Sequence, residues 1–170
     1  ADVAGKGIQS SLVMSMLRSI LHLVTNTTKS AGVILDWINK GITGKIDMDH
    51  YATLSFLSYS PADHSVEYAS AGHQPLLIWR EAGKKIEVVR QNTDPIGVER
   101  GSKYPELKLT VQKGDIIIFF TDGLIEALNQ EGRQYGVESL SRVIAQSSSL
   151  TAKEIATEVK HNIQAFVGSA

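Results

Sequence analysis

The chain has 170 residues, a length that suits one domain. Hydrophobic residues make up 42% and charged residues 21%, a balance that allows a core to form and argues against wholesale disorder. The 17 Lys and Arg residues against 18 Asp and Glu give a net charge of −1, which argues against a general binder of nucleic acid or acidic membranes. The absence of cysteine excludes disulfides, zinc thiolates, iron–sulfur clusters and thiol nucleophiles.

The ends and the hydropathy of the chain predict its setting. No apolar run reaches the roughly 18 residues of a membrane span, and the first residues do not resemble a signal peptide. We therefore expect a cytoplasmic protein that makes no membrane contact through this segment. The chain opens on Ala1 and closes on Ala170 with neither an initiator Met nor a charged tail, which predicts a piece of a longer polypeptide.

Two helices are predicted near the N-terminus. Residues 8–24 carry two apolar series at i, i+4 spacing, which predicts a well-buried helix with a broad apolar face: Leu12, Met16 and Ile20, and Val13, Leu17 and Leu21. Ser30 is predicted to cap a second helix, and Gly41 to end it. That helix would carry Val33, Ile34, Trp37 and Ile38.

Strands are predicted in the middle of the chain. Short runs rich in β-branched and aromatic residues occur at 51–59, 65–70, 75–80, 86–90 and 104–111. Their connections are too short for parallel crossovers, so antiparallel hairpins are expected. The continuous apolar run 116–120 predicts a central strand buried on both faces.

The helical period returns near the C-terminus. Thr151 and Glu154 fit a capping box, which opens a helix with Ile155, Val159, Ile163 and Phe166 on one face. The order of helices, antiparallel strands and helices predicts a layered α+β domain.

Two segments contain carboxylates that suit a metal ion. Asp2 precedes a glycine-rich turn into a helix, where side-chain and carbonyl oxygens can hold a hard cation, but a plain strand-to-helix turn explains the pattern too. The segment lacks the Gly-x-x-x-x-Gly-Lys-Ser/Thr pattern of a P-loop. Asp122 follows the apolar run and is either a ligand or a turn residue. Local sequence favours the turn, because Asp-Gly is a common turn pair.

Histidines give weaker signals. His73 lies at a strand–turn–strand junction, and its pattern favours hydrogen bonding to the turn backbone over a catalytic role. The other four show no pairing at metal-ligand spacing: His22, His50, His64 and His161. No Gly-x-Ser-x-Gly elbow is present, so a serine hydrolase of that type is unsupported.

Three ordered motifs together resemble one family. They are Asp-Val-Ala-Gly-Lys-Gly before a long helix, Tyr-Ala-Ser-Ala-Gly-His-Gln-Pro in the middle, and Gly-Asp-x-x-x-x-Phe-Thr-Asp-Gly-x-x-Glu-Ala later. The chain resembles the metal-dependent serine/threonine phosphatases of the PPM (PP2C-like) superfamily. It is most similar to their bacterial branch, typified by stage II sporulation protein E and the sigma-factor-regulating phosphatases. Asp94-Pro95-Ile96-Gly97 and the segment from Asn129 to Gly136 support the resemblance.

The resemblance implies a fold, a metal centre and a reaction. The fold is a four-layer α-β-β-α sandwich of antiparallel sheets. Asp2, the backbone carbonyl of Val3 and Asp122 match metal-ligand positions for two Mn²⁺ or Mg²⁺ ions. The implied reaction is hydrolysis of phosphoserine or phosphothreonine monoesters by metal-activated water, so Asp2 and Asp122 are catalytic through that water. The implied partner is a phosphorylated protein substrate of the anti-sigma-factor-antagonist kind.

Departures from the family pattern qualify this reading. Ala4 stands where many relatives carry a histidine, and neither the upstream Gly-Gly-Asp segment nor the downstream Asp-Asp segment of the family occurs. We therefore expect residues 1–170 to be a single phosphatase domain, incomplete at both ends and nearly inactive alone. Unpaired sheet edges would favour a homodimer. The rival hypotheses are a non-catalytic regulatory or pseudophosphatase module on the same scaffold, and a metal hydrolase of small phosphoesters.

Overall fold

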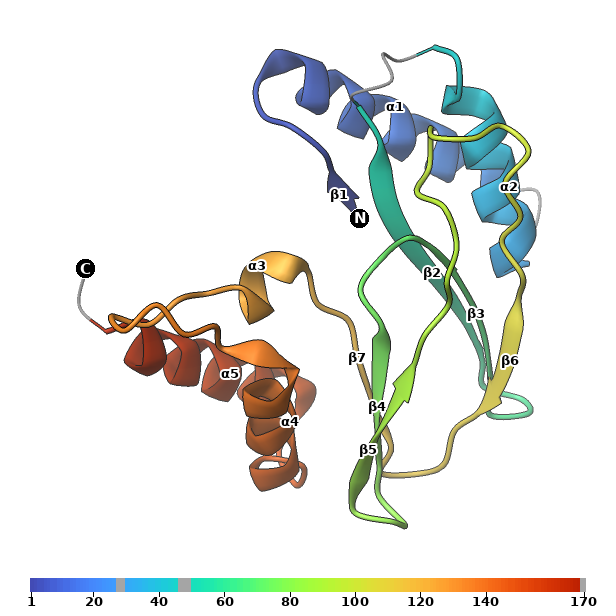
Figure 1. Cartoon of the computed structure of the whole chain (residues 1–170). Coiled ribbons are helices and arrows are strands. Elements are labelled where there is room, and N and C mark those ends of the chain that lie inside the picture. The colour runs from blue at the N-terminus through green and yellow to red at the C-terminus, as the bar shows by residue number, and fades with distance from the viewer. Residues whose placement is uncertain (27–29, 46–49, 169–170) are drawn as a thin grey trace. The chain divides into compact units, whose positions relative to one another are not determined.

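The computed structural model describes residues 1–26, 30–45 and 50–168, and Figure 1 shows its elements. The chain divides into two units, each with its own sheet and its own hydrophobic core. The first comprises Ala1–His73 and Gln91–Val111, and the second comprises Gln74–Arg90 and Gln112–Ala170.

A four-stranded antiparallel sheet with two helices forms the described part of the first unit. Its strands lie in the order β1-β2-β3-β6, with β1 (Asp2–Val3), β2 (Ala52–Ser60), β3 (Ser65–Ala71) and β6 (Leu107–Thr110). The helices are α1 (Ile8–Val24) and α2 (Ala31–Ile42). Strand β6 occupies only part of the predicted run 104–111.

Alternation along the strands gives this sheet two different faces. Ala52 and Leu54 on β2 and Ala69 and Ala71 on β3 pack in one core with Ile34, Leu35 and Ile38 of α2. Thr53 and Ser55, between and beyond those apolar residues of β2, lie on the opposite face. The sheet therefore has an apolar face under the helices and a second face with a polar row.

The predicted burial of the first helix is wrong. Its bounds are as expected, but Leu12 is 59% exposed and Met16 is only half-buried, whereas Val13 and Leu17 are buried. Helix α2 contacts strands β2 and β3, while α1 contacts α2 and β1. The stripe of Val13 and Leu17 therefore carries most of the burial of α1, while the second stripe reaches the core only at Ile20 and leaves Leu12 exposed.

The start of the second helix is confirmed and its predicted end is wrong. The Ser30 side chain accepts a hydrogen bond from the Val33 N–H, as an N-cap does. Gly41 lies inside α2, which runs on to Ile42. A Cβ at Gly41 would lie 3.1 Å from Ile20 Cδ1, so this glycine permits close contact between the two helices.

The second unit combines a three-stranded antiparallel sheet with three helices. The strand order is β5-β4-β7, with β4 (Leu76–Arg80), β5 (Lys85–Val89) and β7 (Ile116–Ile118). The helices are α3 (Asp122–Ile125), α4 (Gly136–Gln146) and α5 (Ala152–Val167). The predicted capping box is confirmed, because the Thr151 and Glu154 side chains each accept a hydrogen bond from the other's backbone N–H.

The prediction of a central strand at 116–120 is wrong. Strand β7 is only three residues long, all of them half-buried, and it lies at the edge of its sheet beside β4. Phe119, beyond its end, is 47% exposed. Helix α5 packs in the same core as this run, so the helix and not a second neighbouring strand covers its side chains. A continuous apolar run is the same in a central strand and in an edge strand that a helix covers.

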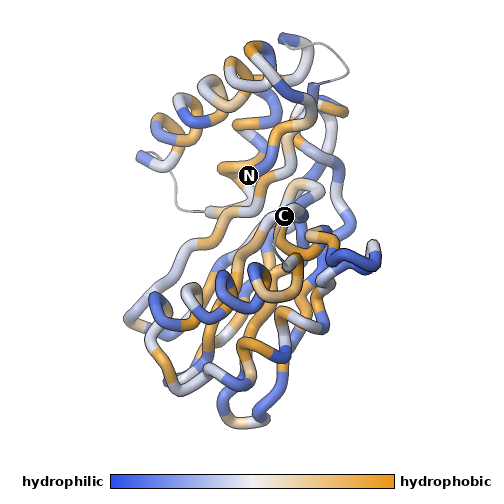
Figure 2. Tube along the Cα trace, turned by 90° about the vertical axis from the view of Figure 1, so that its left-hand side faces the viewer, coloured by the Kyte–Doolittle hydropathy of each residue, from blue (hydrophilic) through white to orange (hydrophobic). Residues whose placement is uncertain are grey.

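The expected α+β class with antiparallel sheets is confirmed. Along the helices, hydrophobic and hydrophilic residues alternate, as helices with one packed face require (Figure 2). Within the described ranges, no helix combines the length and apolar character needed to cross a membrane.

Candidate functional site

Strand β1 gives the Asp2 carboxylate a defined direction. Asp2 lies opposite Thr53 and Val3 opposite Ala52 in the antiparallel ladder with β2. Val3 packs against the apolar core under the helices. Since successive side chains of a strand point to opposite faces, Asp2 lies on the other face of the sheet, with Thr53. Asp2 is exposed there.

The same register fixes the direction of the Val3 carbonyl. The Ala4 N–H donates to the Tyr51 carbonyl oxygen at 2.8 Å, which makes residues 4 and 51 a hydrogen-bonded pair. The next pair, Val3 and Ala52, is therefore a non-hydrogen-bonded pair, and its backbone groups point outward. Accordingly, the Ala52 N–H donates to the Ile96 carbonyl and the Ala52 carbonyl accepts from the Ile96 N–H, on the side of Ala52 away from Val3. The Val3 carbonyl points to the outer edge of β1, the terminal strand of this sheet.

A glycine loop connects β1 to α1. Gly5 and Gly7 have φ values of +88° and +89°, which residues other than glycine rarely adopt. A Cβ at Gly5 would lie 3.0 Å from Ser10 Oγ, and that hydroxyl donates to the Ala4 carbonyl at 3.1 Å. The loop after Asp2 thus depends on glycine for both its backbone angles and its contact with α1.

Asp122 opens a single helical turn rather than the predicted Asp-Gly turn. It is the first residue of α3, and Thr121 is the N-cap. Its carboxylate Oδ1 accepts from the N–H of Gly123 at 2.8 Å, and its carbonyl accepts from the N–H of Glu126 at 2.8 Å. Asp122 is partly buried. The bond from Gly123 uses Oδ1 and does not involve the second carboxylate oxygen, Oδ2.

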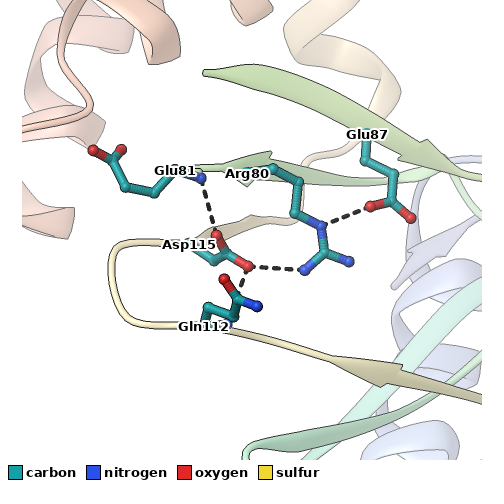
Figure 3. Close-up of polar contacts among 5 residues, drawn as sticks. All are labelled: Arg80, Glu81, Glu87, Gln112 and Asp115. Carbon is teal, nitrogen blue, oxygen red and sulfur yellow. Dashed lines mark hydrogen bonds and ion pairs between the residues drawn. The ribbon is translucent and has the colours of Figure 1, made fainter. Parts of the chain in front are cut away.

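An ionic network braces the strand that leads to Asp122. Figure 3 shows Arg80 at the end of β4 between the carboxylates of Asp115 and Glu87. Arg80 Nη1 lies 2.8 Å from Asp115 Oδ2, and Arg80 Nε lies 2.6 Å from Glu87 Oε2. Asp115 also accepts from the backbone N–H groups of Glu81 and Gln112. The network joins the β4–β5 hairpin to the turn before β7.

The electrostatics of Asp115 follow from these contacts. Its side chain is only 4% exposed, and burial acts to raise its pKa. The hydrogen bonds from Arg80 and the two backbone N–H groups outweigh burial, so the pKa of the Asp115 carboxyl lies below its usual value. Asp115 therefore holds the turn as a carboxylate.

His73 contacts a side chain that the sequence did not indicate. It follows β3 as predicted, and its Nδ1 lies 2.7 Å from Thr53 Oγ1. Its backbone N–H donates to Ser70 Oγ at 3.3 Å. Thr53 is the cross-strand partner of Asp2, so the first unit brings Asp2, Thr53 and His73 to one region.

Further hydroxyl groups continue this polar row. Ser55 Oγ lies 3.3 Å from the Tyr68 hydroxyl and 3.2 Å from Ser70 Oγ. Sequence reasoning missed these residues and Thr53. The alternation of hydroxyl residues with apolar residues along β2 is the signal that could have identified them.

The predicted metal ligands are divided between the two units. Asp2 and Val3 belong to the first and Asp122 to the second, so a centre that joins them stays a prediction. Within residues 1–26, 30–45 and 50–168, no group of three or more His, Asp or Glu side chains could hold a metal ion. The donors themselves are two carboxylates and an outward carbonyl, and such hard oxygen ligands fit Mg²⁺ or Mn²⁺.

An apolar groove lies beside β7 within the second unit. Its wall on the strand side includes Ile117 and Phe119, and its wall on α5 includes Ile155 and Ile163.

The strand-edge pairing expected for a homodimer stays a prediction.

Comparisons with known proteins identify the relatives of this chain. A family model described as stage II sporulation protein E (SpoIIE) matches residues 1–170. Among characterised proteins, the chain is 27% identical over 132 residues to the phosphoserine phosphatase RsbU of Bacillus subtilis (strain 168). That match covers 78% of this chain and 39% of RsbU, so the chain spans well under half the length of this relative.

Solved structures of low sequence identity share the fold. The SiaA-PP2C domain of Pseudomonas aeruginosa has a TM-score of 0.83 at 15% identity, covering 98% of this chain and 66% of that one. RsbX, solved in complex with magnesium, has a TM-score of 0.72 at 16% identity, covering 96% of this chain and 71% of that one. These similarities confirm the PP2C-like fold that the motifs implied.

Proposed function

The chain belongs to the stage II sporulation protein E family, and from this premise we propose that it forms part of a metal-dependent protein phosphatase domain. The proposed reaction is hydrolysis of phosphoserine or phosphothreonine monoesters in a protein substrate. The observation that carries the proposal is the strand register of β1. It directs the Asp2 carboxylate to the polar face of the sheet and the Val3 carbonyl to the sheet edge.

The proposed metal ligands are Asp2, the Val3 carbonyl and Asp122, for two Mn²⁺ or Mg²⁺ ions in the intact domain. When bound, the ions would lower the pKa of the attacking water and balance the charge of the phosphoryl group. Asp2 and Asp122 would hold the ions, and the glycine loop would turn the chain from β1 into α1 directly after the Asp2 and Val3 donors. Two facts support this assignment: the three proposed ligands are all oxygen donors, which Mg²⁺ prefers, and the structural relative RsbX was solved in complex with magnesium.

The proposed substrate is a phosphorylated protein of the anti-sigma-factor-antagonist kind. Support comes from RsbU, which is named a phosphoserine phosphatase. Because the chain spans 39% of RsbU, activity and partners of the whole protein belong to this proposal. We further propose that the 170 residues alone are nearly inactive, since Asp2 and Asp122 are only two carboxylates of the family's ligand set.

The test uses the longest natural protein that contains these residues. With Mn²⁺ it should release phosphate from a phosphoserine-bearing antagonist protein, and a chelator should abolish the release. Release at the same rate in chelator would overturn the metal mechanism. Metal binding without hydrolysis would favour the pseudophosphatase module. Hydrolysis of p-nitrophenyl phosphate but not of any phosphoprotein would favour a hydrolase of small phosphoesters.

A further inference from the structure

The turn that carries His73 is held from two sides. The Gly72 N–H donates to Thr93 Oγ1 at 3.1 Å, and the Thr93 hydroxyl donates to the Ser70 carbonyl at 2.7 Å. Gly72 has a φ of +62°, and a Cβ there would lie 2.9 Å from Pro95 Cγ. These contacts hold the backbone directly before His73 in place.

The imidazole is directed at the residue opposite Asp2. Thr53 Oγ1 lies 2.7 Å from His73 Nδ1, and Thr53 is the cross-strand partner of Asp2. Directly opposed side chains in an antiparallel pair lie on one face, with Cβ atoms about 4.5–5.5 Å apart. A threonine hydroxyl can therefore reach a carboxylate oxygen across this pair in a staggered rotamer of Asp2.

The tautomer of His73 sets which way the proton of Thr53 points. A threonine hydroxyl has one proton and two acceptor lone pairs, and one nitrogen of a neutral imidazole is a donor. If Nδ1–H donates to Thr53 Oγ1, the hydroxyl proton is left to donate toward the anionic carboxylate of Asp2. The opposite arrangement would aim oxygen lone pairs at that carboxylate.

We propose that Thr53 and His73 are positioning residues for Asp2: His73 donates Nδ1–H to Thr53, whose hydroxyl donates to the Asp2 carboxylate and orients it. Carboxylates that hold metals are commonly oriented by such hydrogen bonds. The proposal rests on the proposed function where it makes Asp2 a metal ligand. It revises the role expected for His73, from a contact with the turn backbone to a contact that reaches Asp2 through Thr53.

The test measures Mn²⁺ affinity by calorimetry in the longest natural protein that contains the chain. Thr53→Val and His73→Phe should each weaken Mn²⁺ binding by about 10–100-fold, the usual effect of losing a partner of a metal ligand. The double variant should be no weaker than the weaker single variant, since the two residues act in series. Thr53→Ser and His73→Asn, which keep a hydroxyl and a donor near Nδ1, should restore affinity to within about threefold of wild type.

A matched control lies on the same β2–β3 hairpin. Tyr59 is on the same face of β2 as Thr53, and its hydroxyl lies 3.2 Å from His64 Nδ1. This second pair of a hydroxyl and a histidine is exposed, at the end of β2 away from Asp2. Tyr59→Phe should leave Mn²⁺ affinity unchanged. If Tyr59→Phe weakened Mn²⁺ binding as much as Thr53→Val does, the loss would come from disturbance of the hairpin, and the proposal would be overturned.

A second readout does not depend on metal or activity. Nitrogen-15 NMR of the metal-free protein should show His73 as the Nδ1–H tautomer, and Thr53→Val should reduce that preference. An Nε2–H tautomer, or unchanged Mn²⁺ affinity in Thr53→Val and His73→Phe with an unchanged melting temperature, would overturn the proposal. A wild-type protein that binds Mn²⁺ but hydrolyses no phosphoprotein would overturn the proposed function alone. A wild-type protein that binds no Mn²⁺ would overturn both.

Discussion

Asp2 and Asp122 both lie where a strand gives way to a helix, but the backbone holds them by different means. Asp2 is part of a strand, and its pairing with Thr53 decides the face on which it lies. Asp122 is not part of a strand: it begins the one-turn helix α3 a few residues after the edge strand β7. Its own carboxylate binds the next N–H, that of Gly123.

The difference shows two ways to direct a carboxylate. For Asp2, cross-strand pairing does so directly, and the glycine loop that follows turns the chain into α1. For Asp122, the direction depends on how the strand before it is anchored, and the Arg80–Asp115 contact supplies that anchor from the preceding turn. Substitutions that remove a proposed metal-ligating carboxylate can be compared with substitutions that remove only the contacts holding it in place.

The largest effect is expected when either carboxylate is neutralised. Asp2→Asn or Asp122→Asn in the intact domain should lower the phosphatase rate constant about 1,000-fold, because a metal ion supplies several kcal/mol of charge stabilisation. Melting temperature should change little, since neither side chain is in a core. Glu131→Gln, at an exposed carboxylate, is the control for both assays and should retain full activity. Full activity in Asp122→Asn would remove that residue from the proposed metal ligands.

The anchor should act on stability and depend on pH. Asp115→Asn should cost about 1.5–3 kcal/mol, the value of hydrogen bonds to charged groups, and lower the melting temperature by about 3–10 °C. The pKa of Asp115 is depressed in the folded state, so its contribution is present above the unfolded pKa of about 4 and is lost as pH falls through the folded pKa.

Thermal melts of wild type and Asp115→Asn from pH 7 to pH 3 measure this dependence. The difference between the two should be constant above about pH 5 and shrink below about pH 4. Glu131→Gln breaks only an exposed pair with Arg133 and should cost less than about 1 kcal/mol. A difference that grows toward low pH would contradict the assigned role of Asp115.

A smaller effect separates the glycines beside His73 and Asp122. Gly72→Ala should cost about 2 kcal/mol, because φ is +62° and a Cβ would lie 2.9 Å from Pro95 Cγ. Gly123 has no atom within 4 Å of an added Cβ and lies in a helical turn. Gly123→Ala should therefore leave stability unchanged or raise it by about 0.5 kcal/mol. Equal losses in chemical denaturation would show that the two turns are equally constrained.

The smallest effect concerns Leu12, the exposed end of the second apolar stripe of α1. Leu12 is 59% exposed, so Leu12→Ser should change the free energy of unfolding by less than about 0.5 kcal/mol. Leu17 is 4% exposed, and Leu17→Ala should cost about 2–5 kcal/mol in the same denaturation experiment. A comparable cost for the two would restore the broad buried face that the apolar spacing predicts.

Much of the fold was predictable because its signals are local. The Ser30 cap and the Thr151–Glu154 capping box were predicted because each interaction spans three residues. The antiparallel hairpins followed from short connections, and the family followed from three ordered motifs. The candidate ligands Asp2 and Asp122 came from the same motifs, although their joint metal centre stays a prediction.

The sequence alone determined where most of the helices and strands lie, since capping, periodicity and connection length act between near neighbours. Only the tertiary structure decided that Thr53 lies opposite Asp2, that His73 contacts Thr53, and that β7 is an edge strand. It also decided that Gly41 lies inside a helix, against Ile20 of another. Each of these depends on contacts between residues about 20 or more positions apart, and packing across the sheet, rather than local preference, selects such contacts.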